Sequence, residues 1–135
     1  MLLSLTSISG IALKTEAFER LTLSTLDGVI TMLPGHEPLI SALKPGVMSV
    51  WFDGQKKDYA IGGGILETDG VDIKIIADMI EDGGHNLEEI ATRKAQALAQ
   101  MQEYQQKGDP LSLEAYIELE QAYLKDVARE QLAMK

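Results

Sequence analysis

The chain of 135 residues contains no cysteine. This absence excludes a thiolate nucleophile, a disulfide framework and cysteine-based zinc or iron–sulfur sites. Imidazole ligands are equally scarce, since His36 and His85 are the two histidines of the sequence. His85 lies four residues before Glu89, but one histidine with one carboxylate makes an incomplete metal site, so we expect a solvated histidine at the junction before the helices. We therefore expect no bound metal and no catalytic cysteine.

Basic residues are also in deficit. The sequence has 12 Lys and Arg against 21 Asp and Glu, which gives a formal net charge of -9. Proteins that bind nucleic acid gain affinity by placing many Lys and Arg against the phosphates. The composition argues against a nucleic-acid partner.

Long apolar runs are missing as well. No stretch reaches the ~18 apolar residues of a membrane-spanning helix, so we expect no direct membrane insertion. The apolar N-terminus has no charge before Lys14, and it is interrupted by Ser4, Thr6, Ser7 and Ser9. A targeting segment needs a basic start and an unbroken apolar run. The pattern favours a first β-strand instead.

Glycine-containing turn pairs divide the first 84 residues into short apolar segments, which is typical of an all-β sandwich or barrel. One predicted strand has an apolar face of five alternating residues, namely Val71, Ile73, Ile75, Ala77 and Met79. The glycine triplet at positions 62–64 is not followed by the Lys-Ser or Lys-Thr pair of a phosphate-binding loop. A bulge or a tight connection is the favoured interpretation of the triplet.

The stretch LPGHEPLISALKPG, at positions 33–46, holds the two residues most suggestive of acid–base chemistry. His36 and Glu37 are adjacent, so on an extended chain their side chains point to opposite faces, and no nucleophile or metal site accompanies them. A small hydrolase using His36 is therefore not favoured. The two Pro-Gly pairs that bound the stretch predict type II turns.

The hydrophobic period changes after His85. Asn86 followed by Glu89 predicts a helix start, and apolar residues then recur at helical spacing. The sequence KGDP, at positions 107–110, predicts the end of this helix and the start of a second one. Because so short a connection favours antiparallel helices, we predict an all-β domain at positions 1–84 followed by an α-helical hairpin at positions 85–135.

The first predicted helix presents mostly alanine on its apolar face. Burying alanine gains little free energy at about 25 cal/mol per Å² of apolar surface. We expect this face to dock the hairpin weakly on the sandwich, so that the hairpin can exchange between two positions. The plainer alternative is that the hairpin simply completes the fold.

Three segments together resemble the epsilon subunit of bacterial F-type ATP synthases. They are DGVITMLPGHEPLISALKPGVMSV at positions 27–50, YAIGGGILE at 59–67 and VDIKIIADMIE at 71–81. Their order, their spacing and the helical hairpin after them agree with that family. The resemblance implies a sandwich of about ten strands followed by two helices.

The resemblance also implies a function. Such a subunit is a non-catalytic part of the central stalk, or rotor, and helps to couple ion-driven rotation of the c-ring to ATP synthesis in the catalytic head. Its implied partners are the gamma subunit, the polar loops of the c-ring and, with the helices extended, the catalytic beta and alpha subunits. The implied location is peripheral, on the cytoplasmic face of the inner membrane.

In this family the hairpin can extend and block ATP hydrolysis. The resemblance makes three cations candidates to meet acidic groups of the catalytic subunits, namely Lys125, Arg129 and Lys135. Tyr116, Tyr123 and Leu124 are the candidates for apolar contact in the same state.

Two departures from the family pattern bear on binding. Some relatives bind ATP through Ile/Leu-Asp-x-x-Arg-Ala, and the matching positions here are Leu87, Glu88, Ala91 and Thr92. Since the arginine is replaced by Ala91, we expect no nucleotide cofactor. The glutamate that often faces the c-ring is replaced by Val29, so Val29, Ile30 and His36 become the candidates for contact with the ring or gamma. A free-standing β-sandwich adaptor with a partner-binding hairpin is the alternative function.

Overall fold

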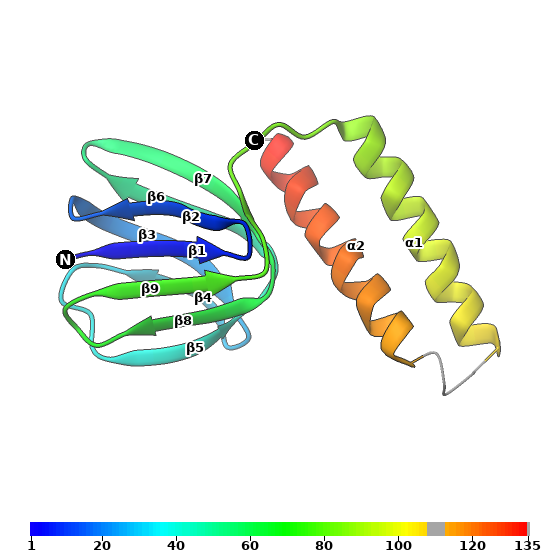
Figure 1. The fold of residues 1–135 in the computed structure, drawn as a ribbon, viewed down its shortest axis with the longest axis horizontal. Helices are drawn as coiled ribbons and strands as arrows, with labels where there is room; N and C mark the ends of the chain where they lie inside the picture. Colours follow the sequence, from blue (N-terminus) through cyan, green and yellow to red (C-terminus); the bar gives the residue numbers. More distant parts are fainter. Residues whose placement is uncertain (108–112, 135) are drawn as a thin grey trace.

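The computed structural model of the chain describes residues 1–107 and 113–134. Within these residues, ten strands precede two helices (Figure 1). The strands are β1 (Leu3–Ser7), β2 (Gly10–Thr15), β3 (Phe18–Thr25), β4 (Gly28–Met32), β5 (Leu39–Leu43), β6 (Gly46–Phe52), β7 (Gln55–Ile61), β8 (Gly64–Thr68), β9 (Ile73–Ala77) and β10 (Ile80–Glu81). The helices are α1 (Leu87–Lys107) and α2 (Leu113–Ala133). This order confirms the predicted fold class.

The strands pair in the order β10-β7-β6-β3-β5-β8-β9-β1-β2, and β4 pairs with β3. The path turns from one layer of the sandwich to the other where β3 meets β5, at Thr25 and Leu43. β1 and β9 run parallel, whereas the other pairs are antiparallel. The core lies between the layers and is formed by alternating apolar residues, among them Leu3, Leu5, Leu21, Leu23, Met48, Val50, Leu66, Ile73 and Ile75.

β9 shows the predicted alternation, with corrections at both ends, because Val71 and Met79 lie outside the strand and Met79 packs with Ala60 and Ala128. Ile73, Ile75 and Ala77 are buried, but Val71 is 66% exposed and does not belong to the strand. The cause is local, since Oδ1 of Asp69 accepts hydrogen bonds from the backbone N–H groups of Val71 and Asp72, at 2.8 Å each. These bonds keep the preceding turn closed until Ile73 begins the strand.

One of the two predicted type II turns is present. Gly35 has a φ of 82°, and the N–H of His36 donates to the carbonyl of Leu33 at 3.2 Å. The other prediction was wrong, because Gly46 opens β6 directly without a positive φ. The N–H of Lys44 instead donates to the carbonyl of Ser24 at 3.1 Å, which ties the segment to the end of β3.

The helices form the predicted antiparallel hairpin (Figure 1). Asn86 caps α1, because its Oδ1 accepts from the N–H groups of Glu88 and Glu89 at 2.9 and 3.3 Å. The glycine and proline predicted to separate the helices, at positions 108 and 110, lie outside the described residues. α2 lies between the sandwich and α1, so α2 is the helix that meets the strands.

Two neighbouring residues of β9 test how far the sandwich depends on its inner face. Ile75 is fully buried, whereas Ile76 points outward and is 61% exposed. Ile75→Ala should lower the free energy of unfolding by about 2–5 kcal/mol, because it leaves a cavity in the core. Ile76→Ala should change it by no more than about 0.5 kcal/mol. Urea denaturation of both variants measures the difference, and equal losses would contradict the inner-face assignment.

Candidate functional site: the charged junction between sandwich and hairpin

The apolar contact between the hairpin and the sandwich is small. α2 packs on β6 and β7 through a cluster of Ala60, Met79 and Ala128, with Leu132 at its margin. The expectation that the alanine-rich face of the first helix docks on the sandwich was therefore wrong. α2 takes this position because its small residue Ala128 allows close packing. Its cations Lys125 and Arg129 also match the acidic residues that follow β9.

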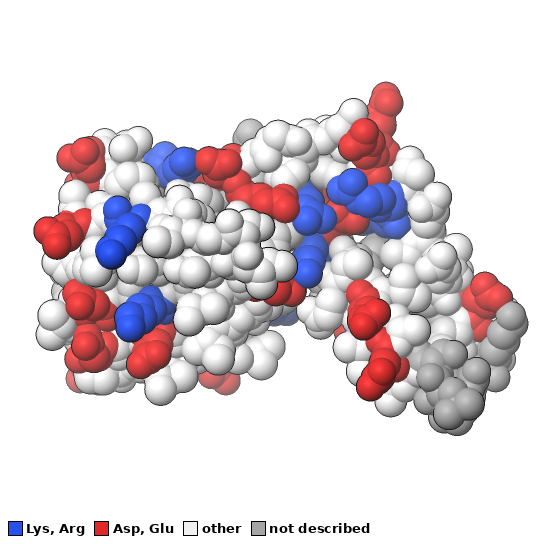
Figure 2. All heavy atoms as spheres, viewed as in Figure 1, with Lys and Arg blue, Asp and Glu red and all other residues white. Residues whose placement is uncertain are grey.

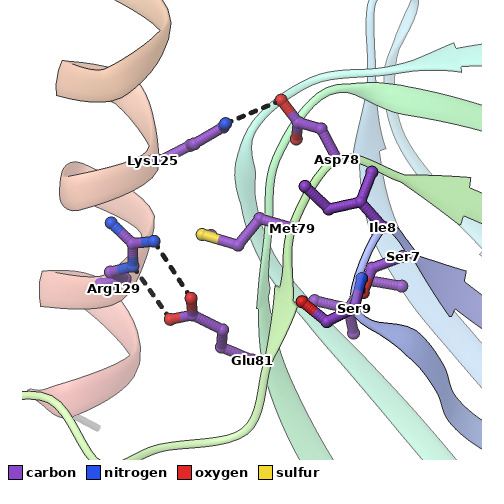
Figure 3. A pocket seen from close by; sticks show the side chains of 9 residues that line it. Ser7, Ile8, Ser9, Asp78, Met79, Glu81, Lys125 and Arg129 are labelled. Atoms are coloured by element: carbon purple, nitrogen blue, oxygen red, sulfur yellow. Dashed lines mark hydrogen bonds and ion pairs between the residues drawn. The ribbon is translucent and has the colours of Figure 1, made fainter.

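Two ion pairs join α2 to the segment that follows β9 (Figure 3). Nζ of Lys125 lies 2.9 Å from Oδ2 of Asp78. Arg129 makes a two-pronged contact with Glu81, because Nε donates to Oε2 at 2.9 Å and Nη2 donates to Oε1 at 3.0 Å. Such a fork fixes both the distance and the orientation of the two groups. The position of α2 on the sandwich is thus set by charges as well as by apolar contact.

The charged network continues into α1 through a buried carboxylate. Asp126 is 4% exposed, and its Oδ1 accepts from Nη1 of Arg129 at 2.9 Å and from Nη2 of Arg93 at 2.8 Å. A separate pair joins the helices nearby, with Nζ of Lys94 3.1 Å from Oε2 of Glu130. Figure 2 shows Lys and Arg gathered with Asp and Glu where the hairpin meets the sandwich.

The network holds its carboxylates in the charged form. Burial alone would raise the pKa of Asp126, but the hydrogen bonds from Arg93 and Arg129 outweigh it and lower that pKa below the ordinary value. The hydrogen bond from Arg129 likewise lowers the pKa of Glu81, against a smaller opposing effect of burial. Both acids are therefore ionised at neutral pH.

Gly62 makes room for one of these pairs. A Cβ added at Gly62 would collide with Oδ1 of Asp78 and would approach Cε of Lys125 to 3.3 Å. Oδ1 of Asp78 is buried, while Oδ2 reaches Lys125. Gly64 must also be glycine, because a Cβ added there would collide with the backbone of Ile76 and Ala77. The glycine triplet is thus a tight connection, as predicted, and its first member shapes the seat of α2.

His85 was expected to be a solvated residue at the junction, and this was wrong. Its side chain is 10% exposed, and Nε2 lies 3.3 Å from Oε2 of Glu81 without forming a hydrogen bond. The Glu81 side chain that His85 approaches is itself bound to Arg129, which places His85 near the docked α2.

A cavity of about 240 Å³ opens beside the ion pairs, between α2, the end of β9 and the turn from β1 to β2. Its charged lining consists of the two pairs already described, so Lys125 and Arg129 are both neutralised there. Across residues 1–107 and 113–134, no three His, Asp or Glu side chains gather to hold a metal ion. Within the same ranges, neither helix is long and apolar enough to span a membrane.

The candidates for inhibitory contact lie on two sides of α2, with Tyr116 and Tyr123 toward α1 and Lys125 and Arg129 toward the sandwich, whereas Lys135 lies outside the described residues. The ring of Tyr116 packs on that of Tyr104 with centroids 4.9 Å apart, and Nζ of Lys94 lies 5.8 Å from the ring centroid of Tyr123. Leu124 is half-buried.

The positions of the degenerate nucleotide motif lie on the first turns of α1. Leu87, Glu88, Ala91 and Thr92 are exposed there. A shallow pocket of about 390 Å³ is lined by Glu88, Glu89, Thr92 and Arg93. The guanidinium of Arg93 is bound to Asp126, and the glutamates add negative charge, so this surface has little to attract a phosphate.

The candidates for contact with the ring or gamma separate into exposed and partly buried residues. Val29 is 70% exposed on β4, whereas its neighbour Ile30 packs against the core. His36 is half-buried, and its Nδ1 lies 2.7 Å from the carbonyl oxygen of Glu37. Val29 is accordingly the most accessible of the three.

The structure also shows a surface that the sequence reasoning missed. Five residues lie side by side across the outer face of β5-β8-β9-β1-β2, and we call them the outer row: Ala42, Ile65, Ile76, Thr6 and Ile11. Its isoleucines are 53–68% exposed. Figure 2 shows this face largely uncharged near the hairpin and charged toward the far end. The sequence did contain an indication of this surface, because Ile76 follows Ile75 and therefore places an apolar side chain on the otherwise polar face of β9.

Together these features define a class of protein, a ten-stranded β-sandwich that carries an ion-paired antiparallel helical hairpin. The chain belongs to the family described as ATP synthase, Delta/Epsilon chain, beta-sandwich domain, whose model matches residues 1–83. This confirms the resemblance inferred from the sequence.

Curated relatives agree with this family. An ATP synthase epsilon chain of Psychrobacter cryohalolentis is 42% identical over 64 residues, which is 47% of this chain and 46% of the relative. One of Legionella pneumophila is 38% identical over 74 residues, 54% of this chain and 52% of the relative. The chain spans about half the length of the curated relatives it matches.

Solved structures extend the likeness to the hairpin. A chain from the Euglena gracilis mitochondrial ATP synthase, in the assembly of OSCP, F1 and c-ring, has a TM-score of 0.77 and 26% identity, over 96% of this chain and 78% of that one. A chain from the central stalk and c-ring of the Tetrahymena thermophila enzyme has a TM-score of 0.55 over 67% of this chain and 69% of that one. At 18% identity, the second likeness shows the fold alone.

Acid should release the hairpin before it unfolds the sandwich. Because the hydrogen bond from Arg129 across the junction lowers the pKa of Glu81 in the docked state, the undocked state binds more protons in the acid range. Docking is therefore fully favoured at neutral pH and weakens below about pH 4, where free carboxyls take up protons. NMR signals of Ala60 and Met79 should shift before those of Ile75 as the pH falls. Simultaneous change of all three would contradict this order.

Proposed function

We propose that this protein is a rotor subunit of an F-type ATP synthase, in which the sandwich docks on the gamma subunit and the hairpin restrains ATP hydrolysis. The observation that carries the proposal is the charged junction, which combines few apolar contacts with several ion pairs. The family relationship and the likeness to chains of ATP synthase assemblies support the choice of complex. The subunit itself performs no catalysis in this proposal.

The outer row is the proposed docking surface for gamma. The exposed isoleucines of β8 and β9 are neighbours, and with Ile11 of β2 beyond Thr6 they form a largely apolar strip that a partner would remove from water. A rigid sheet presents such a strip without ordering cost, which favours stable association. Val29 and His36 remain the proposed contacts with the polar loops of the c-ring. The subunit then lies at the cytoplasmic surface of the membrane, attached through its partners.

The hairpin is the proposed regulatory element, at positions 85–135. In the docked state Lys125 and Arg129 are bound to Asp78 and Glu81 of the sandwich part, at positions 1–84. In the extended state the same cations exchange these carboxylates for acidic groups of the catalytic subunits, with Tyr116, Tyr123 and Leu124 in apolar contact. Because ion pairs replace ion pairs, the free-energy difference between the two states is small enough for partners to control.

The outer row can be tested by introducing charge. Ile65→Glu combined with Ile76→Glu should weaken binding to the purified gamma subunit by at least about tenfold, because two carboxylates would be buried in an apolar contact. Thr31→Glu, an exposed change on β4 in the other layer, is the matched control and should bind normally. Calorimetric titration measures the dissociation constants. Normal binding by the double variant would remove the outer row from the proposed interface.

The regulatory role predicts effects of opposite sign on the assembled enzyme. Deleting residues 86–135 should raise ATP hydrolysis without preventing assembly, because the restraining element is gone. Asp78→Asn combined with Glu81→Gln should lower hydrolysis, because the sandwich loses its hold on an intact hairpin and the extended state gains population. Steady-state hydrolysis is measured over a range of ATP concentrations. Rates that stay unchanged in both variants would leave the hairpin without a regulatory role.

A further inference from the structure

We propose that closure of the hairpin and its docking on the sandwich depend on each other, because a relay of four charges connects α1 to the sandwich through α2. The relay is Glu81, Arg129, Asp126 and Arg93, and it passes through three elements, β10, α2 and α1. This inference deepens the proposed function by specifying how the hairpin is released, and its regulatory meaning rests on that function.

The geometry places Arg129 at the branch point. Its Nε and Nη2 face Glu81, while Nη1 faces Asp126 on its own helix. Asp126 is shared in turn, because Arg93 reaches it from α1 through both Nη2 and Nε, at 2.8 and 3.1 Å. Arg93 and Glu81 are thus the two ends of the relay.

The charge balance explains why the ends depend on each other. With both helices in place, Arg93 and Arg129 offset Asp126 and leave one positive charge to meet Glu81. If α1 leaves or Arg93 is removed, Asp126 and Arg129 cancel, so α2 presents no net charge to Glu81. Because Asp126 is buried, solvent screens its charge weakly, so the change in charge is felt at Glu81. Opening α1 therefore weakens the docking of α2, and undocking α2 weakens the hold on α1.

A double-mutant cycle tests this coupling on the full chain. Because the sequence has no cysteine, dyes can be placed at two introduced cysteines, Gln55→Cys on the sandwich and Gln102→Cys on α1. Single-molecule energy transfer then gives the ratio of undocked to docked molecules. Glu81→Gln and Arg93→Gln should each raise this ratio roughly two- to tenfold, and the double variant should raise it by less than the product of the two.

Lys94→Gln is the matched control for Arg93→Gln. It removes the same charge from the neighbouring position of α1 and breaks another pair between the helices, to Glu130, which lies outside the relay. Combined with Glu81→Gln it should give the product of the single effects. If the double variant Arg93→Gln with Glu81→Gln also raised the ratio by the full product of the two single effects, the relay would be overturned.

Circular dichroism reports whether α1 stays helical in each variant. If Arg93→Gln unfolds α1, Arg93→Ala takes its place in the cycle, because alanine also removes the charge and has the highest helix propensity, and the same criterion applies. The cycle uses the isolated chain, whereas the regulatory role is tested by hydrolysis in the assembled enzyme. Failure of the coupling and failure of the proposed function are therefore distinguishable.

Discussion

The arrangement of this protein depends on the contact of Arg129 with two carboxylates. One side of the guanidinium binds Glu81 at the end of the sandwich, and the other binds Asp126 on α2. Because a guanidinium is planar and always charged, it fixes the angle between the groups it joins. The seat of α2 depends on this contact together with the apolar cluster at Ala128, and α1 is joined to it through Arg93, which binds the same Asp126.

The two parts of the chain are stabilised in different ways. The sandwich closes on a continuous apolar core, so its stability comes from buried surface. The hairpin has a small apolar contact and several ion pairs, each of which contributes about 1 kcal/mol or less when solvent reaches it. A hairpin held in this way can be exchanged between partners while the sandwich stays intact. This difference links the physical chemistry of the junction to the regulatory role that we propose.

Much of the fold was predictable because local rules determine it. Alternation in β9, the turn at Gly35 and the cap at Asn86 depend on residues close in sequence. The docking of α2 was not predictable, because Glu81 and Arg129 lie 48 positions apart and their pairing depends on tertiary geometry. The alanine-rich face of α1 led to the wrong choice of docking helix, because composition does not reveal which helix carries the charges that match the sandwich. The need for glycine at position 62 likewise arises from Asp78, a distant residue that packs against it.

Native-state hydrogen exchange of the full chain is the most direct test of a charge-held hairpin. The account predicts that amides of α1 and α2 exchange through one shared opening, at lower free energy than the amides of β1, β6 and β9. Raising the salt concentration should speed exchange in both helices, because salt screens the ion pairs, and should leave the strands unchanged. Equal protection of helices and strands, with no effect of salt on the helices, would contradict the account.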